Sequence, residues 1–251
     1  MPEYSSKEII HMTQQENFQA QHINKNEWEE CLPSEVAFWD NYLKTKGDEW
    51  KDDFAMRLNP HASLQNIFVN YLDQTITKNL ILDVGAGPIT FINKKSDPSQ
   101  VEIIAVDPLA ELYDELLRKH NIVPLVRTQK CDGEKLTAKF SEDTFDIVHS
   151  RNALDHSYDP VKCIEEMIKV AKKGRFVILQ VFEKEGSFEK WHGLHQWNFF
   201  IAKKSFFGKN QLYLQGRNTP KINLTEVFMN RAHIFQLTKN KREIVVVFKK
   251  I

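Results

Sequence analysis

The sequence lacks the features that mark several classes of protein. It has three cysteines among 251 residues, Cys31, Cys131 and Cys163, and their odd number and wide spacing offer neither a disulfide framework nor a zinc site. It has no excess of charge, because 34 basic and 34 acidic residues give a formal net charge of zero. A protein that mainly binds nucleic acid usually carries a basic excess, so we expect no nucleic-acid partner.

Long apolar runs are missing as well. No run approaches the ~20 residues that a membrane-spanning helix needs. The first residues, Met1–Glu8, contain no apolar core of a signal peptide. We therefore expect a cytoplasmic protein without a membrane partner. Its length allows one large domain with a small appendage.

The region before residue 77 shows apolar residues at helical spacing and no convincing strand. The segments with this spacing are 5–20, 34–46 and 61–73. Ser34, after a proline, is a good N-cap for the second segment, and Gly47 is well placed to end it. We expect residues 1–76 to form a helical cap in front of the main domain.

From residue 77 to residue 251, short apolar runs alternate with helical segments. A helix is predicted over 109–119, and another begins at Asp159-Pro160 and ends at Gly174. The last two apolar runs read as an antiparallel hairpin at the sheet edge. This order predicts an α/β fold, a Rossmann-like doubly wound sheet that is mostly parallel. The expected strands are 80–84, 101–106, 122–127, 144–149, 175–182, 233–238 and 243–250.

The run Leu80–Pro88 is the most informative part of the chain. An apolar strand ends in Asp83, and Gly85 and Gly87 then allow a tight turn and close approach of a ligand. A carboxylate at this place would repel the pyrophosphate of a dinucleotide. It suits S-adenosylmethionine (SAM), which has an ammonium and a sulfonium and no phosphate. Pro88 fits the first turn of a following helix.

Further polar residues follow the next strands. Asp107 ends the second strand, where a carboxylate can accept hydrogen bonds from both hydroxyls of a ribose. Asp132 follows the third strand and could accept from an adenine amino group. A dinucleotide dehydrogenase is the competing interpretation, but its glycine pattern needs a small third residue where this chain has Thr90.

These residues make the chain resemble the class I SAM-dependent methyltransferases over about residues 75 to 251. The resemblance rests on the stretches 81–87, 105–107, 131–133, 145–148 and 174–179, and on the closing hairpin. It implies a methyltransferase with SAM as cofactor and S-adenosylhomocysteine (SAH) as product. The residues expected to bind SAM are Arg57, Asp83, Gly85, Ala86, Gly87, Asp107, Pro108, Leu109, Asp132, Gly133, Ser150 and Arg151.

Bases cluster after the fourth and fifth strands. His156 is our first choice for a general base that removes the proton of an acceptor hydroxyl, with Asp155 or His195 orienting or replacing it. His192 lies three residues before His195, a spacing that would place both on one helical face. Imidazole and carboxylate groups also suit divalent metals, but no specific metal motif is present and we expect no metal. A structural role for His156 in its loop is equally open.

The acceptor is the least determined part of the prediction. The stretches 38–39, 57–60, 152–156 and 193–197 look like those of a bacterial subgroup that accompanies surface polysaccharide pathways. This resemblance implies a hydroxyl on a sugar or capsular polysaccharide precursor, such as a sugar nucleotide. N-methylation of an amine or amide, or a SAM-binding module without catalysis, remain alternatives. The cap would cover the SAM pocket, with Arg57 pairing with an anion.

Overall fold

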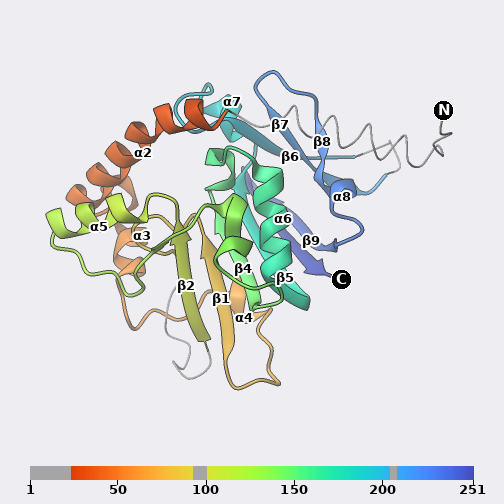
Figure 1. Ribbon diagram of the computed structural model, residues 1–251, viewed down its shortest axis with the longest axis horizontal. Coiled ribbons are helices and arrows are strands. Elements are labelled where there is room, and N and C mark those ends of the chain that lie inside the picture. The colour runs from red at the N-terminus through yellow and green to blue at the C-terminus, as the bar shows by residue number, and fades with distance from the viewer. Residues whose placement is uncertain (1–23, 93–100, 204–207) are drawn as a thin grey trace.

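The computed structural model describes residues 24–92, 101–203 and 208–251. Its centre is a seven-stranded sheet with the strand order β3-β2-β1-β4-β5-β10-β9 (Figure 1). Strands β1 to β5 are parallel, and β10 runs antiparallel to both of its neighbours. These strands are β1 (Asn79–Val84), β2 (Val101–Asp107), β3 (Gln129–Lys130), β4 (Phe145–Arg151), β5 (Ala171–Phe182), β9 (Ala232–Asn240) and β10 (Glu243–Lys250).

The mostly parallel Rossmann-like sheet with its antiparallel C-terminal hairpin is therefore confirmed. One expected strand is wrong: residues 122–127 form no strand, and on the side away from β1 the neighbour of β2 is the two-residue β3. The apolar side chains of the stretch reach different surroundings. Ile122 packs in the cluster beside α5, Val126 packs in a separate cluster on the sheet, and Val123 is exposed.

Two of the predicted helices flank this sheet. Helix α5 (Ala110–Lys119) follows β2, and α6 (Pro160–Val170) begins after Asp159, whose side chain accepts from Lys162 N at 2.9 Å. The prediction that Gly174 ends α6 is wrong. The helix ends at Val170, and Gly174, with φ +72°, lies in an irregular start of β5 where the pairing with β4 shifts register.

The described N-terminal part differs from the prediction. Helix α2 (Lys25–Thr45) begins after Asn24, which caps it, and continues through Pro33. Ser34 is therefore not an N-cap; inside the helix its hydroxyl donates to the carbonyl of Cys31 at 2.6 Å. Gly47 does follow the helix end, and its N–H donates to the carbonyl of Tyr42. The expected helix over 5–20 lies outside the described residues.

Short elements connect α2 to the sheet. The segment 61–73 contains only the four-residue α4, and its Leu64, Phe68 and Tyr71 pack directly on the sheet. Residues 61–73 are thus packed on the main sheet. The boundary of the predicted cap at residue 76 stays a prediction. The short helices are η1 (Asp48–Trp50), α3 (Lys51–Arg57), α4 (Asn66–Val69), η2 (Gly133–Ala138), η3 (Leu154–His156), α7 (Glu185–Phe188) and α8 (Leu224–Val227).

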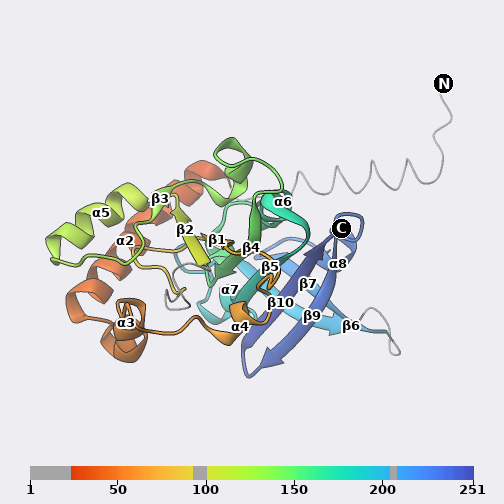
Figure 2. The ribbon, with the colours of Figure 1, turned by 90° about the horizontal axis from the view of Figure 1, so that it is seen from below.

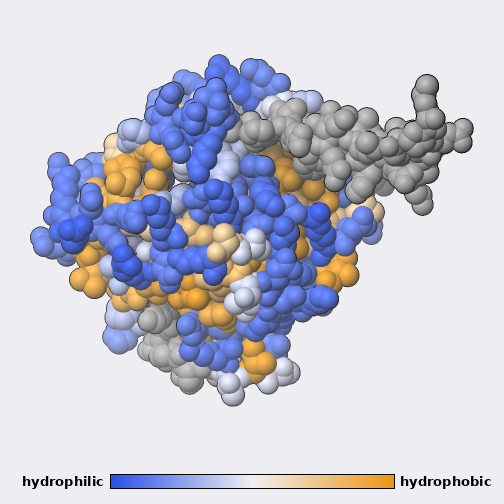
Figure 3. All heavy atoms as spheres, viewed as in Figure 1, coloured by the Kyte–Doolittle hydropathy of each residue, from blue (hydrophilic) through white to orange (hydrophobic). Residues whose placement is uncertain are grey.

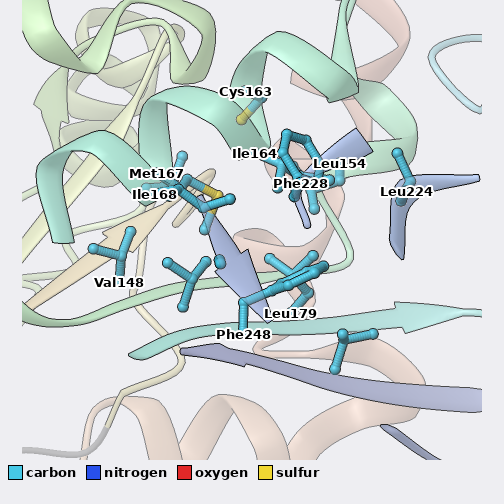
Figure 4. Close-up of a cluster of buried hydrophobic side chains, with 14 of the residues drawn as sticks. Val148, Leu154, Cys163, Ile164, Met167, Ile168, Leu179, Leu224, Phe228 and Phe248 are labelled. Atoms are coloured by element: carbon cyan, nitrogen blue, oxygen red, sulfur yellow. The ribbon is translucent and has the colours of Figure 1, made fainter. Parts of the chain in front are cut away.

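The two faces of the sheet bury separate apolar clusters. Ile164, Met167 and Ile168 of α6 face Leu179 and Phe248 of the sheet (Figure 4). The opposite face packs against α4 and the residues around it. The core thus holds the strands rigidly, so the loops at their carboxyl ends have fixed positions.

A second, three-stranded sheet is inserted between β5 and β9. It consists of β6 (Trp197–Lys203), β7 (Asn210–Gly216) and β8 (Ile222–Asn223). It lies on the side of the molecule away from α3 and α5 (Figure 2). No helix within the described ranges is long and apolar enough to cross a membrane.

Candidate active site

A cavity of about 760 Å³ lies at the carboxyl ends of the parallel strands, under α2. Apolar surface gathers beside α2 on the face shown in Figure 3, and the exposed Phe38 and Trp50 line the cavity. Nearly all predicted site residues line it: Arg57, Asp83, Gly85, Ala86, Gly87, Asp107, Pro108, Leu109, Gly133, Ser150, Arg151, Asp155, His156, His192 and His195. The fold thus brings residues that are far apart in sequence to one place.

The glycine loop after β1 needs its glycines for two reasons. Gly85 and Gly87 have φ values of +71° and +64°, which side chains rarely adopt. In addition, a Cβ at Gly87 would lie 2.6 Å from the ring of Trp39 on α2. The expected helix after this loop is not found within residues 85–92, so Pro88 does not open a helix there.

Asp107 lies at the end of β2 with both carboxylate oxygens on backbone donors. Gly87 N donates to Oδ2 at 3.1 Å, and Leu109 N donates to Oδ1 at 2.9 Å. Burial raises the pKa of this carboxyl to about 7, although the two N–H groups act against that rise. Each oxygen retains a lone pair, so the carboxylate can still accept from hydroxyls of a ligand in the cavity.

Asp83 has more partners than the sequence predicted. Thr90 Oγ1 donates to Oδ2 at 2.5 Å, and the Nδ1 atom of His149 lies 2.8 Å from Oδ1. His149 is fully buried in β4 and faces Gln180 of β5 through its other nitrogen. The acid that we expected to face SAM is therefore also part of a buried polar network.

Asp132 is not among the residues that line the cavity. Its carboxylate lies 3.2 Å from Lys25 Nζ of α2 and 3.8 Å from Lys135 Nζ. The adjacent Gly133 and Glu134 do line the cavity. An adenine contact by Asp132 stays a prediction, while its observed contact is with the beginning of α2.

Two guanidinium groups lie side by side in the cavity. Arg57 donates from Nε to Asp53 at 2.6 Å and from NH1 to the carbonyl of Ile89 at 2.7 Å. Arg151 lies 3.5 Å from Asp53 and stacks over Phe91, with Cζ 4.0 Å from the ring centre. Burial and the neighbouring Arg57 lower the pKa of Arg151. One carboxylate thus faces two cations, which leaves positive charge for an anionic ligand group.

Buried polar atoms near these cations have no partner in the described part of the chain. Ser150 Oγ and Arg151 Nε are both of this kind, and both residues line the cavity. A buried polar atom without a hydrogen bond is costly. The donors and acceptors of a methionine portion and a ribose would suit these atoms, so the residues present fit SAM.

Asp155, His156 and His195 form a compact cluster that lines the same cavity. His195 Nδ1 lies 2.8 Å from Asp155 Oδ2 and 3.0 Å from His156 Nε2. Asp155 comes from η3, and His195 comes from the loop before β6. These three ligand atoms lie within 4.8 Å of one another, so the cluster could also hold a divalent cation.

The cluster has the arrangement of an oriented base. Burial acts against the charged imidazolium of His195, but the hydrogen bond and the charge of Asp155 outweigh it and raise the pKa of His195. Burial likewise acts against the Asp155 carboxylate, but His156 and His195 hold its pKa below the usual value. When Nδ1 of His195 donates to Asp155, its Nε2 is left to accept a proton. His195 thus has the better geometry for a base than His156.

The remaining neighbours hold the cluster in place. His156 Nδ1 lies 3.4 Å from Glu35 Oε2, and Glu35 accepts from Trp39 Nε1 at 2.8 Å, so α2 contacts the cluster directly. His192 also lines the cavity. It does not share a helix face with His195, because residues 191–195 form a turn in which Gly193 has φ +58°.

Sequence reasoning missed Thr90, His149 and Glu35. A signal existed for His149, since a histidine inside an otherwise apolar buried strand usually has buried polar partners. Thr90 was considered only as the wrong residue for a dinucleotide loop. Glu35 lies on a helix of charged and apolar residues and had no signal of its own.

Comparisons with known proteins agree with the geometry. A family model described as a methyltransferase domain matches residues 77–223. An uncharacterized methyltransferase of Schizosaccharomyces pombe is 38% identical over 105 residues, which cover 39% of this chain and 37% of that protein. The match thus spans less than two thirds of the length of the curated relative.

Two solved structures match at low identity, and the first, with the higher TM-score, supports the fold. One is in the complex between the Haloferax volcanii Trm112 methyltransferase activator and a methyltransferase, with a TM-score of 0.52 and 12% identity over 86% of this chain and 96% of that one. The other is a SAM-dependent methyltransferase from Methanosarcina mazei, with a TM-score of 0.47 and 16% identity over 75% of this chain and 99% of that one.

Proposed function

Because the chain belongs to the methyltransferase domain family, we propose that it is a class I SAM-dependent methyltransferase that methylates a hydroxyl oxygen of a small polar acceptor. The acceptor class is a sugar or capsular polysaccharide precursor, such as a sugar nucleotide. This class rests on the resemblance of the sequence to a bacterial subgroup. The cavity of about 760 Å³ is within the usual range for small-molecule sites.

One observation carries the proposal: the Asp155–His195 pair lines the same cavity as the glycine loop and Asp107. In the proposed arrangement, Asp107 accepts from the ribose hydroxyls and Gly85 and Gly87 lie along the cofactor. Arg57 and Arg151 face its carboxylate. The acceptor then lies between the cofactor and His195.

The residues of the chain would act on the proton rather than on the methyl group. SAM supplies a methyl carbon that its sulfonium has already activated. The acceptor oxygen forms the new bond to that carbon while the carbon–sulfur bond breaks, and SAH is released. The hydroxyl proton passes to Nε2 of His195, and the Asp155 carboxylate stabilises the resulting imidazolium. His156 and Glu35 hold this pair in position.

Helix α2 has a second role in the proposal. Trp39 and Glu35 contact the glycine loop and the base cluster from the same helix. The helix therefore covers the cavity and excludes water from the reacting groups. This is the covering role expected for the N-terminal segment.

The direct test is methyl transfer from radiolabelled SAM to a panel of sugar nucleotides and capsule intermediates. We expect label on a hydroxyl, and its loss in His195→Gln. The matched control is His233→Gln, which changes an exposed residue of β9. Label on amines alone would contradict the proposal and favour N-methylation. Transfer that disappears with a chelator would show that the cluster holds a metal instead of acting as a free base.

A further inference from the structure

A buried histidine that the proposed reaction does not use connects Asp83, just before the glycine loop, to β10 through hydrogen bonds. His149 of β4 is fully buried and lies opposite Asp83 of β1 in the parallel register. Its Nδ1 lies 2.8 Å from Asp83 Oδ1, and its Nε2 lies 3.0 Å from Gln180 Oε1. Gln180 Nε2 in turn donates to Glu243 Oε1 of β10 at 3.1 Å. The network crosses four neighbouring strands.

The hydrogen count of this network fixes the state of the imidazole. Asp83 accepts from Thr90 at one oxygen, so its other oxygen needs a hydrogen on Nδ1 of His149. Gln180 must turn its amide nitrogen to the Glu243 carboxylate, because its oxygen would be repelled there. The oxygen of Gln180 then faces Nε2 of His149, which also needs a hydrogen.

With Asp83 and Glu243 both ionised, no orientation of Gln180 satisfies the hydrogen bonds of a neutral His149. If the amide turns round, its N–H can donate to a bare Nε2, but its oxygen then faces the carboxylate. A buried polar group without a partner is costly. The network therefore favours one extra proton, and the contacts place that proton on His149.

We propose that His149 is a positioning residue of the cofactor site, held as an imidazolium between Asp83 and Gln180. Its charge balances that of Asp83, so the carboxylate is oriented by hydrogen bonds from two sides. The same contacts order the loop: Thr90 donates to Asp83, and Ile92 N donates to Thr90 Oγ1 at 3.1 Å. The positioning role rests on the proposed function, whereas the proton count does not.

The surroundings of His149 contain few other charges. Phe68 meets its ring edge to face at 4.9 Å between centroids, and Phe91 stacks at 6.2 Å. The charged groups nearest to this assembly are Asp83 from β1, Glu243 from β10 and Arg151 from the end of β4. Arg57 and Asp53 follow beyond Phe91. An imidazole without this proton would leave Nε2 facing Gln180 Oε1 without a hydrogen and would loosen the loop.

The first test reads the proton count in the full-length protein. Nitrogen NMR of ¹⁵N-histidine-labelled protein, assigned with His149→Gln, reports whether one or both ring nitrogens carry hydrogen. We expect both to be protonated at neutral pH. In Glu243→Gln the Gln180 amide can turn freely, so His149 should lose its second proton at lower pH. The matched control is Glu102→Gln, an exposed carboxylate paired with Lys78. A bare ring nitrogen at neutral pH, or no change in Glu243→Gln, overturns the proposal.

The second test reads the positioning role by calorimetric titration with SAH. We expect His149→Gln to weaken SAH binding about tenfold or more at neutral pH, as for the loss of a charge-assisted hydrogen bond. Wild-type affinity should fall over the pH range in which NMR shows His149 losing its proton. His149→Gln should show no such fall. Equal affinity in wild type and His149→Gln, or a wild-type pH profile unrelated to the NMR titration, refutes positioning.

Glu243→Gln keeps this test valid if His149→Gln fails to fold. Its affinity for SAH should fall at lower pH than that of wild type and of Glu102→Gln, in step with its own NMR titration. Failure of every form to bind SAH would contradict the proposed function and, with it, the positioning role. The NMR result would still decide the proton count.

Discussion

Lowering the pH should weaken cofactor binding through a single buried carboxyl. Burial raises the pKa of Asp107 to about 7, from a usual value of 3.8. Above that pH the group is a carboxylate that accepts from Gly87 N and Leu109 N and has lone pairs for the ribose hydroxyls. Below that pH the carboxyl carries a proton, which must face one of the two backbone N–H groups or the ligand. The oxygen that holds the proton then no longer accepts a hydrogen bond in that direction.

The size of the effect follows from the fraction of ionised Asp107. With a pKa of about 7, roughly nine tenths of the molecules are ionised at pH 8 and roughly one tenth at pH 6. If only the ionised form accepts both hydroxyls, affinity falls by about tenfold, or about 1.4 kcal/mol, over these two units. The bound ligand stabilises the carboxylate, so binding should release protons between these pH values.

Calorimetry with SAH at pH 6, 7 and 8, in buffers of different ionisation enthalpy, measures both the affinity and the released protons. Asp107→Asn is the control, since it has no proton to lose in this range. We expect it to bind weakly, because its amide must face a backbone N–H, and to show a flat pH profile. A tenfold change that persists in Asp107→Asn would refute the assignment to this carboxyl, as would wild-type affinity that does not vary with pH.

Three further changes test other parts of the site and the core. His195→Gln should lower kcat by about 10²- to 10⁴-fold without altering SAH affinity. The wild-type rate should rise with pH through the raised pKa of His195, because only the neutral imidazole accepts the proton. Unchanged steady-state turnover in His195→Gln would exclude His195 as the base. Gly87→Ala should lower both Tm and SAH affinity, since its Cβ would lie 2.6 Å from Trp39; calorimetry and melting curves like those of wild type would contradict the close packing. Phe68→Ala should lower the free energy of unfolding in urea by about 3–5 kcal/mol, because Phe68 is fully buried; a loss below about 1 kcal/mol would show that this cluster is not tightly packed.

The parts of the site that follow strand ends could be predicted from sequence. Parallel strands place their carboxyl ends at one edge of the sheet, so residues such as Asp83 and Asp107 had to lie near one another. The strands themselves are marked by apolar runs, and α6 by its N-cap Asp159. Strands and helix caps can be predicted because the residues that determine them lie within a few positions of one another.

Contacts between distant segments could not be predicted in the same way. The sequence indicated that Asp155, His156 and His195 lie near one another, but not that His195 contacts Asp155 directly, because that contact depends on how the loop before β6 folds against η3. The pairing of His149 with Asp83 depends on the register between β4 and β1. Asp132 follows β3 (Gln129–Lys130) instead of the predicted strand over 122–127, and Lys25, more than 100 positions earlier, contacts its carboxylate.

The errors in the predicted elements have similar causes. The helical pattern around Ser34 was interpreted as a helix start because a proline precedes it. In the structure α2 begins earlier and tolerates Pro33, while Ser34 bonds to the carbonyl of Cys31. The stretch 122–127 is an apolar run like those of the true strands, but its side chains pack into separate clusters.

A crystal structure of the complex with SAH tests the central claim most directly. We predict that the ribose hydroxyls contact Asp107 and that the sulfur faces the Asp155–His195 pair across a space open to an acceptor. A ligand bound with its sulfur turned away from His195, or separated from it by protein atoms, would contradict the proposed catalytic arrangement.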